Sequence, residues 1–320
     1  MLKLTKLPNL PFPALCERDA SDKATQTTEG FLSWARDNRE ALRKECMTHG
    51  AVLFRGFPLD TPEQFQEFAR IFCPSLAKYT GGDSPRTNVS GAVYTSTEFP
   101  KELSISMHNE MSYTNSYPRS ILFYCDIPAQ KQGETPLADC RKLLARLPKD
   151  LVERFASKKV TYIQNLHAGM GLGKSWMATF ETTDKAAVEA ILKKRNAVFE
   201  WKDDGGLRVS ETVDQVVAHP DTGEKVFFTQ AHQWHYSELD KETQESLLAI
   251  MDEKDMYHAC TFGDGSPIDV KDLDAIRAAY DAESVAFKWQ KRDVVLVDNI
   301  LVAHGRNPFE GPRRILVAFG

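Results

Sequence analysis

His108 and Glu110, in the segment SMHNEMSY, are the first residues whose types and spacing suggest chemistry. In a β-strand, side chains two positions apart share a face, so this imidazole and this carboxylate could both bind one metal ion. The pair alone is a weak signal, because His-x-Glu occurs by chance in many chains of this length. On its own it more often marks the solvated end of a strand.

A second candidate donor, His304, lies in the C-terminal segment VVLVDNILVAHGRNPFEGPRRILVAFG. It follows an apolar run that predicts a buried strand, and Arg313 and Arg314 begin another apolar run after a Gly- and Pro-rich turn. An arginine that enters a buried strand costs free energy unless it meets an anion, and its planar guanidinium matches a carboxylate bidentately. A surface turn with a solvated arginine pair explains this segment, taken alone, about as well.

Two histidines and one carboxylate on adjacent strands form the facial triad of non-haem Fe(II) oxygenases. Such a triad leaves positions open for a bidentate co-substrate and for O₂. The far carboxylate of a dianionic keto acid then needs a separate cation, which Arg314 could supply. Thr135, in the motif Gly-Glu-Thr, could donate to the same carboxylate, although ordinary turn chemistry explains it equally well.

The composition narrows the classes of partner. The 320 residues carry a formal net charge of −5 and no run of Lys or Arg, which argues against nucleic acid. No apolar stretch approaches the ~18 residues of a membrane span, and prolines at positions 8, 11 and 13 make the N-terminus a poor signal peptide. The six scattered cysteines suit a reducing compartment. We therefore expect a cytoplasmic protein that acts on a small molecule, with no prediction of its oligomeric state.

The elements that must position these residues follow from apolar patterns and turn signals. Helices are predicted over residues 28–49, 62–72, 149–157, 183–195, 238–254 (with Ser237 as its N-cap) and 270–281. Strands are predicted over residues 51–57, 120–126, 198–201, 226–229, 294–299 and 314–319. Residues 76–107 are expected to be irregular.

Because the strands do not alternate regularly with helices, a doubly wound parallel sheet is disfavoured. We predict a mixed α/β fold whose β-rich core is decorated by helices. It is expected to form one domain over residues 1–320, with an irregular N-terminal arm over 1–28 and a helical insertion over approximately 140–290.

The combined motifs resemble the TauD/TfdA-like family of Fe(II)/2-oxoglutarate-dependent dioxygenases, in the branch that includes SyrP-like and clavaminate-synthase-like enzymes. The resemblance rests on the ordered motifs STEFP, HNEMSY, GET, HPDTGEKVFFTQAH, VDN and AHGRNPFEGPRR, from about residue 51 to the C-terminus. Their order is specific, whereas no single motif is. The resemblance implies a double-stranded β-helix, or jelly-roll, core with iron at its open end.

The resemblance also implies roles for individual residues. It assigns the Fe(II) ligands to His108, Glu110 and His304 and a 2-oxoglutarate contact to Thr135. For the salt bridge to 2-oxoglutarate, Arg314 is favoured and Arg313 is the alternative, because Arg314, Leu316 and Ala318 share one face of the last strand. TauD carries a second arginine four residues further on, where this chain has Ala318.

The implied reaction converts 2-oxoglutarate and O₂ to succinate and CO₂ while an unactivated C–H bond of a substrate is oxidised. Hydroxylation is the expected outcome, with desaturation, cyclisation or epoxidation as alternatives. Halogenation is disfavoured because related halogenases lack the carboxylate that Glu110 supplies. By resemblance alone, the substrate is amino-acid-like or another small natural product, free or carrier-bound.

Substrate contacts are predicted at Arg86, Asn109, Phe228, Gln230 and Trp234. For Arg86 and Asn109, loop solvation and strand-edge hydrogen bonding are at least equally good explanations, and Lys78 and Tyr79 have no better support. The pair His232 and His235 offers a second His-x-x-His candidate for a metal. It is disfavoured because the chain has no His-Glu-x-x-His motif.

Two other classes of function compete with an oxygenase. A zinc hydrolase would use the same two histidines and glutamate with an activated water, but it would not explain a dicarboxylate receptor at Thr135 and Arg314. A non-catalytic jelly roll that binds a sugar or an acid would need no triad. Substitution of Arg314 is expected to separate the first alternative from an oxygenase.

Overall fold

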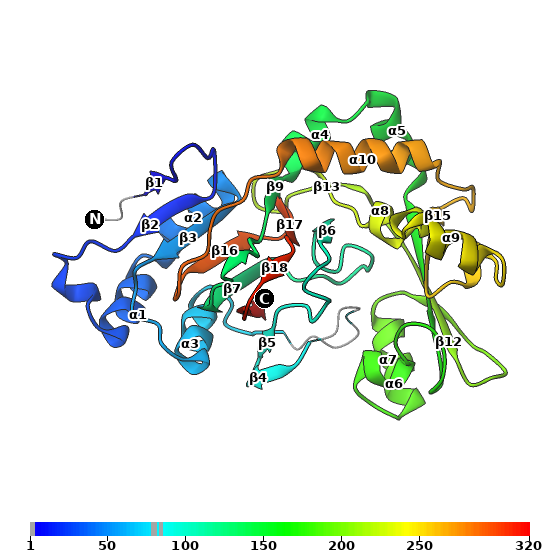
Figure 1. Ribbon diagram of the computed structural model, residues 1–320, viewed down its shortest axis with the longest axis horizontal. Coiled ribbons are helices and arrows are strands. Elements are labelled where there is room, and N and C mark those ends of the chain that lie inside the picture. The colour runs from blue at the N-terminus through cyan, green and yellow to red at the C-terminus, as the bar shows by residue number, and fades with distance from the viewer. Residues whose placement is uncertain (1–3, 78–81, 83–85) are drawn as a thin grey trace.

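The computed structural model describes residues 4–77, 82 and 86–320 of the chain, and its centre is formed by two β-sheets (Figure 1). The larger sheet has eight strands in the order β1 (Thr5–Lys6), β2 (Ala14–Glu17), β3 (Ala51–Arg55), β16 (Val294–Asp298), β7 (Ser120–Ile127), β19 (Arg314–Phe319), β5 (Val93–Thr95) and β4 (Asn88–Ser90). The smaller sheet has the order β6 (Ile105–His108), β17 (Val302–Arg306) and β9 (Leu137–Asp139). In the described part of the chain, the strands do not close into a single barrel.

Alternation along the central strands gives the larger sheet two apolar faces. On β7, Leu122 and Tyr124 belong to the core shared with helices α1 (Thr28–Asp37), α2 (Arg39–His49) and α3 (Pro62–Phe72). Phe123, between them, belongs to the core shared with the smaller sheet. Strands β16 and β19 alternate in the same way, because successive side chains of a strand point to opposite faces. The helices therefore cover one face and leave the other to the smaller sheet.

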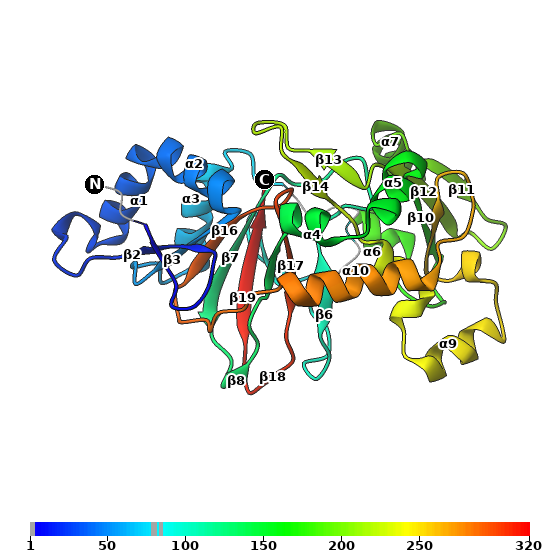
Figure 2. The same cartoon turned by 90° about the horizontal axis from the view of Figure 1, so that it is seen from above.

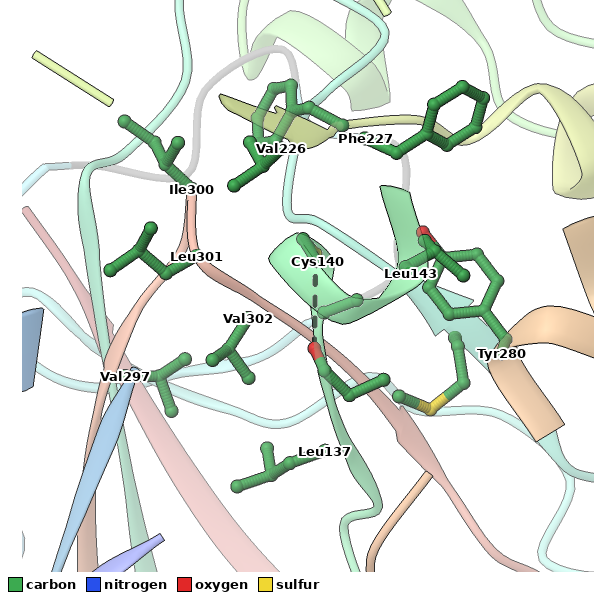
Figure 3. Packing of buried hydrophobic residues seen from close by; sticks show 14 of the residues in the cluster. Leu137, Cys140, Leu143, Val226, Phe227, Tyr280, Val297, Ile300, Leu301 and Val302 are labelled. Carbon is green, nitrogen blue, oxygen red and sulfur yellow. Dashed lines mark hydrogen bonds between the residues drawn. The ribbon is translucent and has the colours of Figure 1, made fainter. Parts of the chain in front are cut away.

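The smaller sheet is supported from behind by helices α4 (Cys140–Arg146) and α10 (Val270–Glu283) and by strand β14 (Lys225–Phe227). Figure 3 shows this packing, in which Tyr280 and Leu143 lie together beyond β9, near Phe227. Leu301, which precedes β17, and Val302, the first residue of β17, are fully buried in the same cluster. This packing fixes the strands that carry the candidate site.

Between β9 and β16 the chain builds the end of the molecule that lies opposite the N-terminal helices (Figure 2). Its four-stranded sheet has the order β11 (Val198–Trp201), β12 (Leu207–Val213), β10 (Val160–Leu166) and β15 (His258–Phe262). Its helices are α5 (Lys149–Lys158), α6 (Trp176–Phe180), α7 (Lys185–Lys194), α8 (Ala231–Trp234) and α9 (Lys241–Leu248). Two short hairpins complete the fold, β13 (Val216–Ala218) with β14, and β8 (Lys131–Gln132) with β18 (Phe309–Glu310).

Most predicted elements are present, and the prediction of a mixed α/β fold with a β-rich core is confirmed. The prediction of a single helix over residues 28–49 is wrong, because the helix is interrupted at Asn38. Its side-chain amide donates to the Trp34 carbonyl at 2.8 Å, and its backbone N–H donates to the same carbonyl at 3.0 Å, so that Asn38 caps the first helix. The helix predicted to begin after Ser237 instead begins at Lys241, where Asp240 accepts a capping hydrogen bond from the Thr243 amide.

Two segments expected to be irregular contain strands. Residues 14–17 pair in parallel with β3, and residues 76–107 contain β4, β5 and part of β6. The segment 140–290, expected to be helical, also contains the four-stranded sheet. Within the described residues, no helix combines the length and the apolar character that crossing a membrane requires.

Candidate active site

The two histidines of the candidate site lie directly opposite each other on neighbouring strands. Strand β17 pairs antiparallel with β6, and His304 is the register partner of His108. Their ring centroids are 4.4 Å apart, and both side chains are buried. Residues 196 positions apart in sequence therefore meet through strand register alone, which explains why neither histidine is informative without the other.

Glu110 lies in the turn that follows β6, and Asn299 holds this turn. The Asn299 amide oxygen accepts from the Glu110 backbone N–H at 2.8 Å, and its nitrogen donates to the Glu110 carbonyl at 3.0 Å. The same nitrogen donates to the Pro118 carbonyl at 2.8 Å. Asn299 is fully buried. This clamp aims the Glu110 carboxylate at the two imidazoles.

The three side chains form a compact, buried set of donors. One ligand atom from each of His108, Glu110 and His304 lies within 4.8 Å of the other two. The His304 Nε2 atom is 3.8 Å from Glu110 Oε2. Two imidazoles and one carboxylate at these distances fit a divalent transition metal of the Fe(II) type.

The protonation of the imidazoles also suits metal binding. The His108 Nδ1 atom is 2.8 Å from the Ser106 carbonyl, which can only accept, so Nδ1 carries the proton and the Nε2 lone pair is available. Burial, and then the charges of His108 and Arg86, hold the pKa of His304 well below its ordinary value. His304 is therefore neutral at pH 7, as a metal ligand must be.

Arg86 pairs with the ligand carboxylate itself. Its Nη2 atom is 2.8 Å from Glu110 Oε2, the same oxygen that faces His304. Both side chains are 3% exposed. The Arg86 guanidinium also lies over the Phe319 ring, 5.1 Å from its centroid.

Thr135 and Arg313 lie together beside the triad. Arg313 donates from Nε to the Gly133 carbonyl at 2.8 Å and from Nη2 to the Thr135 hydroxyl at 3.3 Å. The same hydroxyl accepts from the Trp289 indole at 3.2 Å. A hydroxyl that accepts twice has its own proton left to donate. The pair therefore offers a guanidinium and a hydroxyl donor to an anion.

Desolvation, and then the nearby charge of Arg306, lower the pKa of Arg313 to about 10. Arg313 nevertheless stays charged at pH 7. In the described part of the chain, no carboxylate lies within ion-pair distance of Arg313, whereas Arg314 and Arg86 each have one and Arg306 is held by backbone carbonyls. A buried guanidinium in this position favours an anionic ligand.

Gly133 explains why the Gly-Glu-Thr motif needs its glycine. Its φ is +72°, and a Cβ atom there would lie 2.8 Å from Ala129 Cβ, 2.9 Å from Phe309 Cβ and 3.1 Å from Arg313 Cδ. Any larger residue would push against the Arg313 side chain. The glycine thus gives Arg313 its position.

The preference for Arg314 over Arg313 is wrong about where the side chains lie. Arg314 pairs with Asp126 at 2.9 Å, is 42% exposed, and does not line the space beside the triad. The phase argument grouped Arg314 correctly with Leu316 and Ala318, but that face packs against the N-terminal helices. Arg313 shares the inward phase with Ile315 and Val317.

Two cavities adjoin the triad. The smaller, of about 30 Å³, is lined by both histidines together with Thr135 and three arginines, Arg86, Arg306 and Arg313. The larger, of about 480 Å³, has His108 and Glu110 on one side. Its further lining includes Tyr113, Lys174, Gln230, Gln233, Trp234, Glu238, Tyr257 and His258.

The residues predicted to contact substrate separate into three groups. Gln230 and Trp234 line the larger cavity, and Arg86 lines the smaller one. Asn109 and Phe228 line neither cavity. Asn109 is buried and donates to the Asn299 carbonyl at 2.7 Å, while Phe228 packs on Tyr117. Lys78 and Tyr79 lie outside the described residues.

His232 and His235 do not join a metal cluster among the described residues. The His232 Nε2 atom is 2.8 Å from the Met107 carbonyl, and its ring packs on Tyr280. His235 contacts the Ser237 hydroxyl at 2.9 Å. His232 thus supports the strand that carries His108.

Sequence reasoning missed the functions of Asn299 and Arg306. Both lie in motifs that carry the family resemblance, VDN and AHGRNPFEGPRR, but neither is a ligand type that draws attention. Arg306 donates to the carbonyls of Phe99, Pro100 and Leu103 at 2.5–2.9 Å and so holds the loop beside the larger cavity.

Comparison with known proteins agrees with this geometry. The sequence of residues 21–319 matches the family described as the taurine catabolism dioxygenase TauD, TfdA family. The chain is 35% identical over 269 residues to the dapdiamide synthesis protein DdaC of Enterobacter agglomerans, covering 84% of this chain and 81% of DdaC. It is 31% identical over 277 residues to a clavaminate synthase-like protein of Arabidopsis thaliana, with the same coverage of each chain.

Solved structures share the fold. PvcB of Pseudomonas aeruginosa aligns with a TM-score of 0.52 at 15% identity, over 96% of this chain and 84% of PvcB. An asparagine oxygenase, in complex with Fe(II), hydroxyasparagine and succinate, aligns with a TM-score of 0.58 at 12% identity, over 95% and 92% of the two chains. These likenesses confirm the jelly-roll oxygenase architecture. The chain belongs to the TauD/TfdA family of Fe(II)- and 2-oxoglutarate-dependent dioxygenases.

Proposed function

We propose that His108, Glu110 and His304 bind Fe(II) and that Arg313 and Thr135 hold the distal carboxylate of 2-oxoglutarate. The single observation that carries this proposal is the buried cluster of three donors beside a guanidinium and a hydroxyl donor. A zinc hydrolase would use the donors but leave Arg313 and Thr135 without a purpose. A binding protein without catalysis would not need the donors.

When bound, Fe(II) and 2-oxoglutarate supply O₂ activation, which yields succinate, CO₂ and an oxidised substrate C–H bond. The residues of the chain bind and orient. His108, Glu110 and His304 would hold the metal by three side chains and would leave its other coordination positions to the co-substrate and O₂. Arg313 would neutralise the distal carboxylate of 2-oxoglutarate, and the Thr135 hydroxyl would donate a hydrogen bond to that carboxylate. The positions of these groups decide which C–H bond is oxidised.

The larger cavity is proposed to bind an amino-acid-like substrate. A cavity of about 480 Å³ suits a small molecule. It presents a cation, Lys174, and a carboxylate, Glu238, which also pairs with Arg277 at 3.1 Å, and these two groups can face the carboxylate and the ammonium of an amino acid. The rings of Tyr113 and Trp234 lie 4.4 Å apart, tilted by 34°, and supply an apolar wall. The name of the relative DdaC refers to synthesis of dapdiamide, which supports a small natural product as substrate.

Hydroxylation is the proposed outcome, and desaturation, cyclisation or epoxidation would use the same site. Glu110 is present within the triad, which counts against halogenation. The substrate is proposed to be free or attached to a carrier. All six cysteines are buried thiols, which supports a reducing compartment, the cytoplasm, as the place of action.

A succinate assay with a panel of amino-acid-like compounds tests this proposal. Fe(II)-loaded enzyme should release succinate from 2-oxoglutarate faster with at least one free amino acid or acylated amino acid than without it, and mass spectrometry should find that compound 16 Da heavier if hydroxylated. Lys174→Gln should raise the KM for that compound about tenfold or more. The control Lys225→Gln, an exposed lysine outside both cavities, should leave the KM unchanged. Release that responds to no compound in the panel would contradict an amino-acid-like substrate.

A further inference from the structure

Arg86 occupies an unusual place between the candidate metal ligands and the candidate 2-oxoglutarate receptor. Its guanidinium pairs with Glu110 Oε2 at 2.8 Å, and it lines the smaller cavity that Thr135 and Arg313 also line. Arg86 therefore contacts the triad through Glu110 and lines the same cavity as the candidate receptor residues. Among the described contacts of the other two arginines of this cavity, Arg306 and Arg313, none is with the Glu110 carboxylate.

The three arginines of the smaller cavity are held differently. Arg313 donates to the Gly133 carbonyl, and Arg306 donates to backbone carbonyls of the loop at 99–103. These neutral carbonyls remain acceptors whatever else binds. Arg86 instead pairs with a carboxylate whose facing oxygen lies 3.8 Å from His304 Nε2. A metal ion held by the triad would draw on the same oxygen, so it would weaken the attraction of Glu110 for Arg86.

The charge and the volume of the smaller cavity also favour a move of the Arg86 side chain when a dianion binds. The cavity lining contains three arginines and no carboxylate. A dianion with a carboxylate at each end needs a cation near each end, because burying a carboxylate without a partner is costly, and at the proximal end a metal ion held by the triad would be one such cation. Arg313 contacts the Thr135 hydroxyl, whereas Arg86 contacts Glu110 of the triad and would add a second cation beside the metal. The cavity measures only about 30 Å³, which is small for a dicarboxylate, and a move of the Arg86 side chain would enlarge it.

We propose that Arg86 exchanges partners, from Glu110 to the metal-proximal carboxylate of the co-substrate, and so couples metal binding to 2-oxoglutarate binding. Arg86 competes with the metal for Glu110 and then serves as the second cation of the dicarboxylate receptor. This role is a positioning role, and it rests on the proposed function of the triad and Arg313. It replaces the substrate contact predicted for Arg86 from sequence.

Two titrations of the full chain test the exchange. The first measures binding of Mn(II) alone, from the electron paramagnetic resonance signal of the free ion. The second measures binding of 2-oxoglutarate to Mn(II)-loaded protein by calorimetry. The variants are Arg86→Gln, which removes the charge, and Arg86→Lys, which keeps it. The matched control is Arg154→Gln, which removes an arginine paired with the buried Asp272 at 2.8 Å, outside the site.

The exchange predicts shifts of opposite sign in Arg86→Gln. Mn(II) should bind about threefold or more tightly, because a competing cation is gone, and 2-oxoglutarate should bind about tenfold or more weakly, because a charged hydrogen-bond donor is gone. Arg86→Lys should recover part of both values, since lysine keeps the charge without the planar fork. Arg154→Gln should match the wild type in both titrations.

Other outcomes overturn the exchange. If both ligands bind more weakly to Arg86→Gln, Arg86 only supports the fold or orients Glu110. If Mn(II) binds more tightly while 2-oxoglutarate is unaffected, Arg86 competes for Glu110 but does not belong to the receptor. A wild-type protein that binds both ligands, while Arg86→Gln behaves as Arg154→Gln does, overturns the exchange alone. A wild-type protein that binds Mn(II) but no 2-oxoglutarate overturns the proposed function, and the exchange with it.

Discussion

At the scale of single residues, two adjacent arginines with the same chemistry have opposite environments. Arg313 turns inward, donates to the Thr135 hydroxyl and has no carboxylate partner among the described residues. Arg314 turns outward, is 42% exposed and pairs with Asp126. Surface ion pairs contribute little to stability, whereas a buried guanidinium that meets a carboxylate contributes strongly to binding.

This contrast predicts that the two arginines differ sharply in their effect on 2-oxoglutarate. Arg313→Gln should weaken 2-oxoglutarate binding to the Mn(II)-loaded protein by about tenfold to a hundredfold, because a charge-assisted hydrogen bond is lost. Arg314→Gln is the matched control and should stay within about twofold of the wild type. Calorimetry measures both. Equal losses in the two variants, or a larger loss in Arg314→Gln, would contradict the assignment of Arg313.

At the scale of elements, strand register and two turns build the site. Register places His304 opposite His108, the turn after β6 brings Glu110 to them, and the turn before β9 brings Thr135 and Arg313 together. Each turn depends on one residue that binds no ligand itself. Asn299 holds the first turn and Gly133 permits the second.

Loss of the Asn299 clamp should weaken the metal site. Asn299→Ala removes the amide that bonds both the N–H and the carbonyl of Glu110, so the carboxylate should lose its fixed aim. Mn(II) affinity should fall by about tenfold to a hundredfold, as is typical when groups that orient metal ligands are removed. The control is Asn165→Ala, which removes an amide that bonds the carbonyls of Lys254 and Met256 outside the site. If the control lowers Mn(II) affinity as much, the effect is general destabilisation and not a clamp.

Gly133→Ala should disturb the receptor, and the chain offers a close control. Gly133 and Gly223 both have φ of +72°, but a Cβ atom at Gly223 would meet nothing within 4 Å. Gly223→Ala should cost about 1 kcal/mol of stability from backbone conformation alone. Gly133→Ala should cost more, from the added contacts, and should also weaken 2-oxoglutarate binding by moving Arg313. Denaturant unfolding and calorimetry separate the two effects, and an unchanged 2-oxoglutarate affinity in Gly133→Ala would refute this function of the glycine.

At the scale of the whole molecule, the sequence predicted the sheet strands with strong apolar runs and missed those defined by tertiary pairing. Strands β7, β16 and β19 were predicted because both of their faces are buried, which leaves a continuous apolar run. Strand β6 is short and carries polar residues, and it is fixed by tertiary contacts, namely its pairing with β17 and the contact of His232 with the Met107 carbonyl. The triad residues could be predicted because histidine and glutamate are metal-donor residue types and because their motifs occur in the order that the family resemblance requires.

The choice between Arg313 and Arg314 was beyond the sequence, because it depends on which face of β19 the helices cover. The function of Asn299 could not be predicted from the sequence either, because the sequence does not distinguish a buried asparagine from a solvated one. Residue types and order thus predict which chemistry is present, while register and layer packing decide which side chains carry it out.

Acid should destabilise the whole fold through two histidines that support the site. Burial, and then the charge of Arg277, lowers the pKa of His232 to about 3 and that of His235 to about 4. In the unfolded chain these imidazoles take up protons near the ordinary value of about 6.5. Below that pH the unfolded state binds more protons than the folded state, so stability is lost as pH falls from about 6.5 toward 4.

The expected slope is on the order of 1 kcal/mol per pH unit for each histidine. Urea unfolding at several pH values measures it, and His232→Gln, which keeps a donor for the Met107 carbonyl, should flatten the curve. A wild-type stability that does not change between pH 6.5 and 4.5, or a slope unaltered in His232→Gln, would contradict the neutral, buried state of this residue.

The central claim is that one site built from His108, Glu110, His304 and Arg313 binds Fe(II) and 2-oxoglutarate together. Anaerobic titration of the protein with Fe(II) and 2-oxoglutarate tests it most directly, because a chelate of the two gives a visible metal-to-ligand charge-transfer band. We predict that the band appears in the wild type, is lost in His108→Ala, needs far more 2-oxoglutarate in Arg313→Gln, and is unchanged in Arg314→Gln. A folded wild-type protein that holds one Fe(II) and gives no band would contradict the claim.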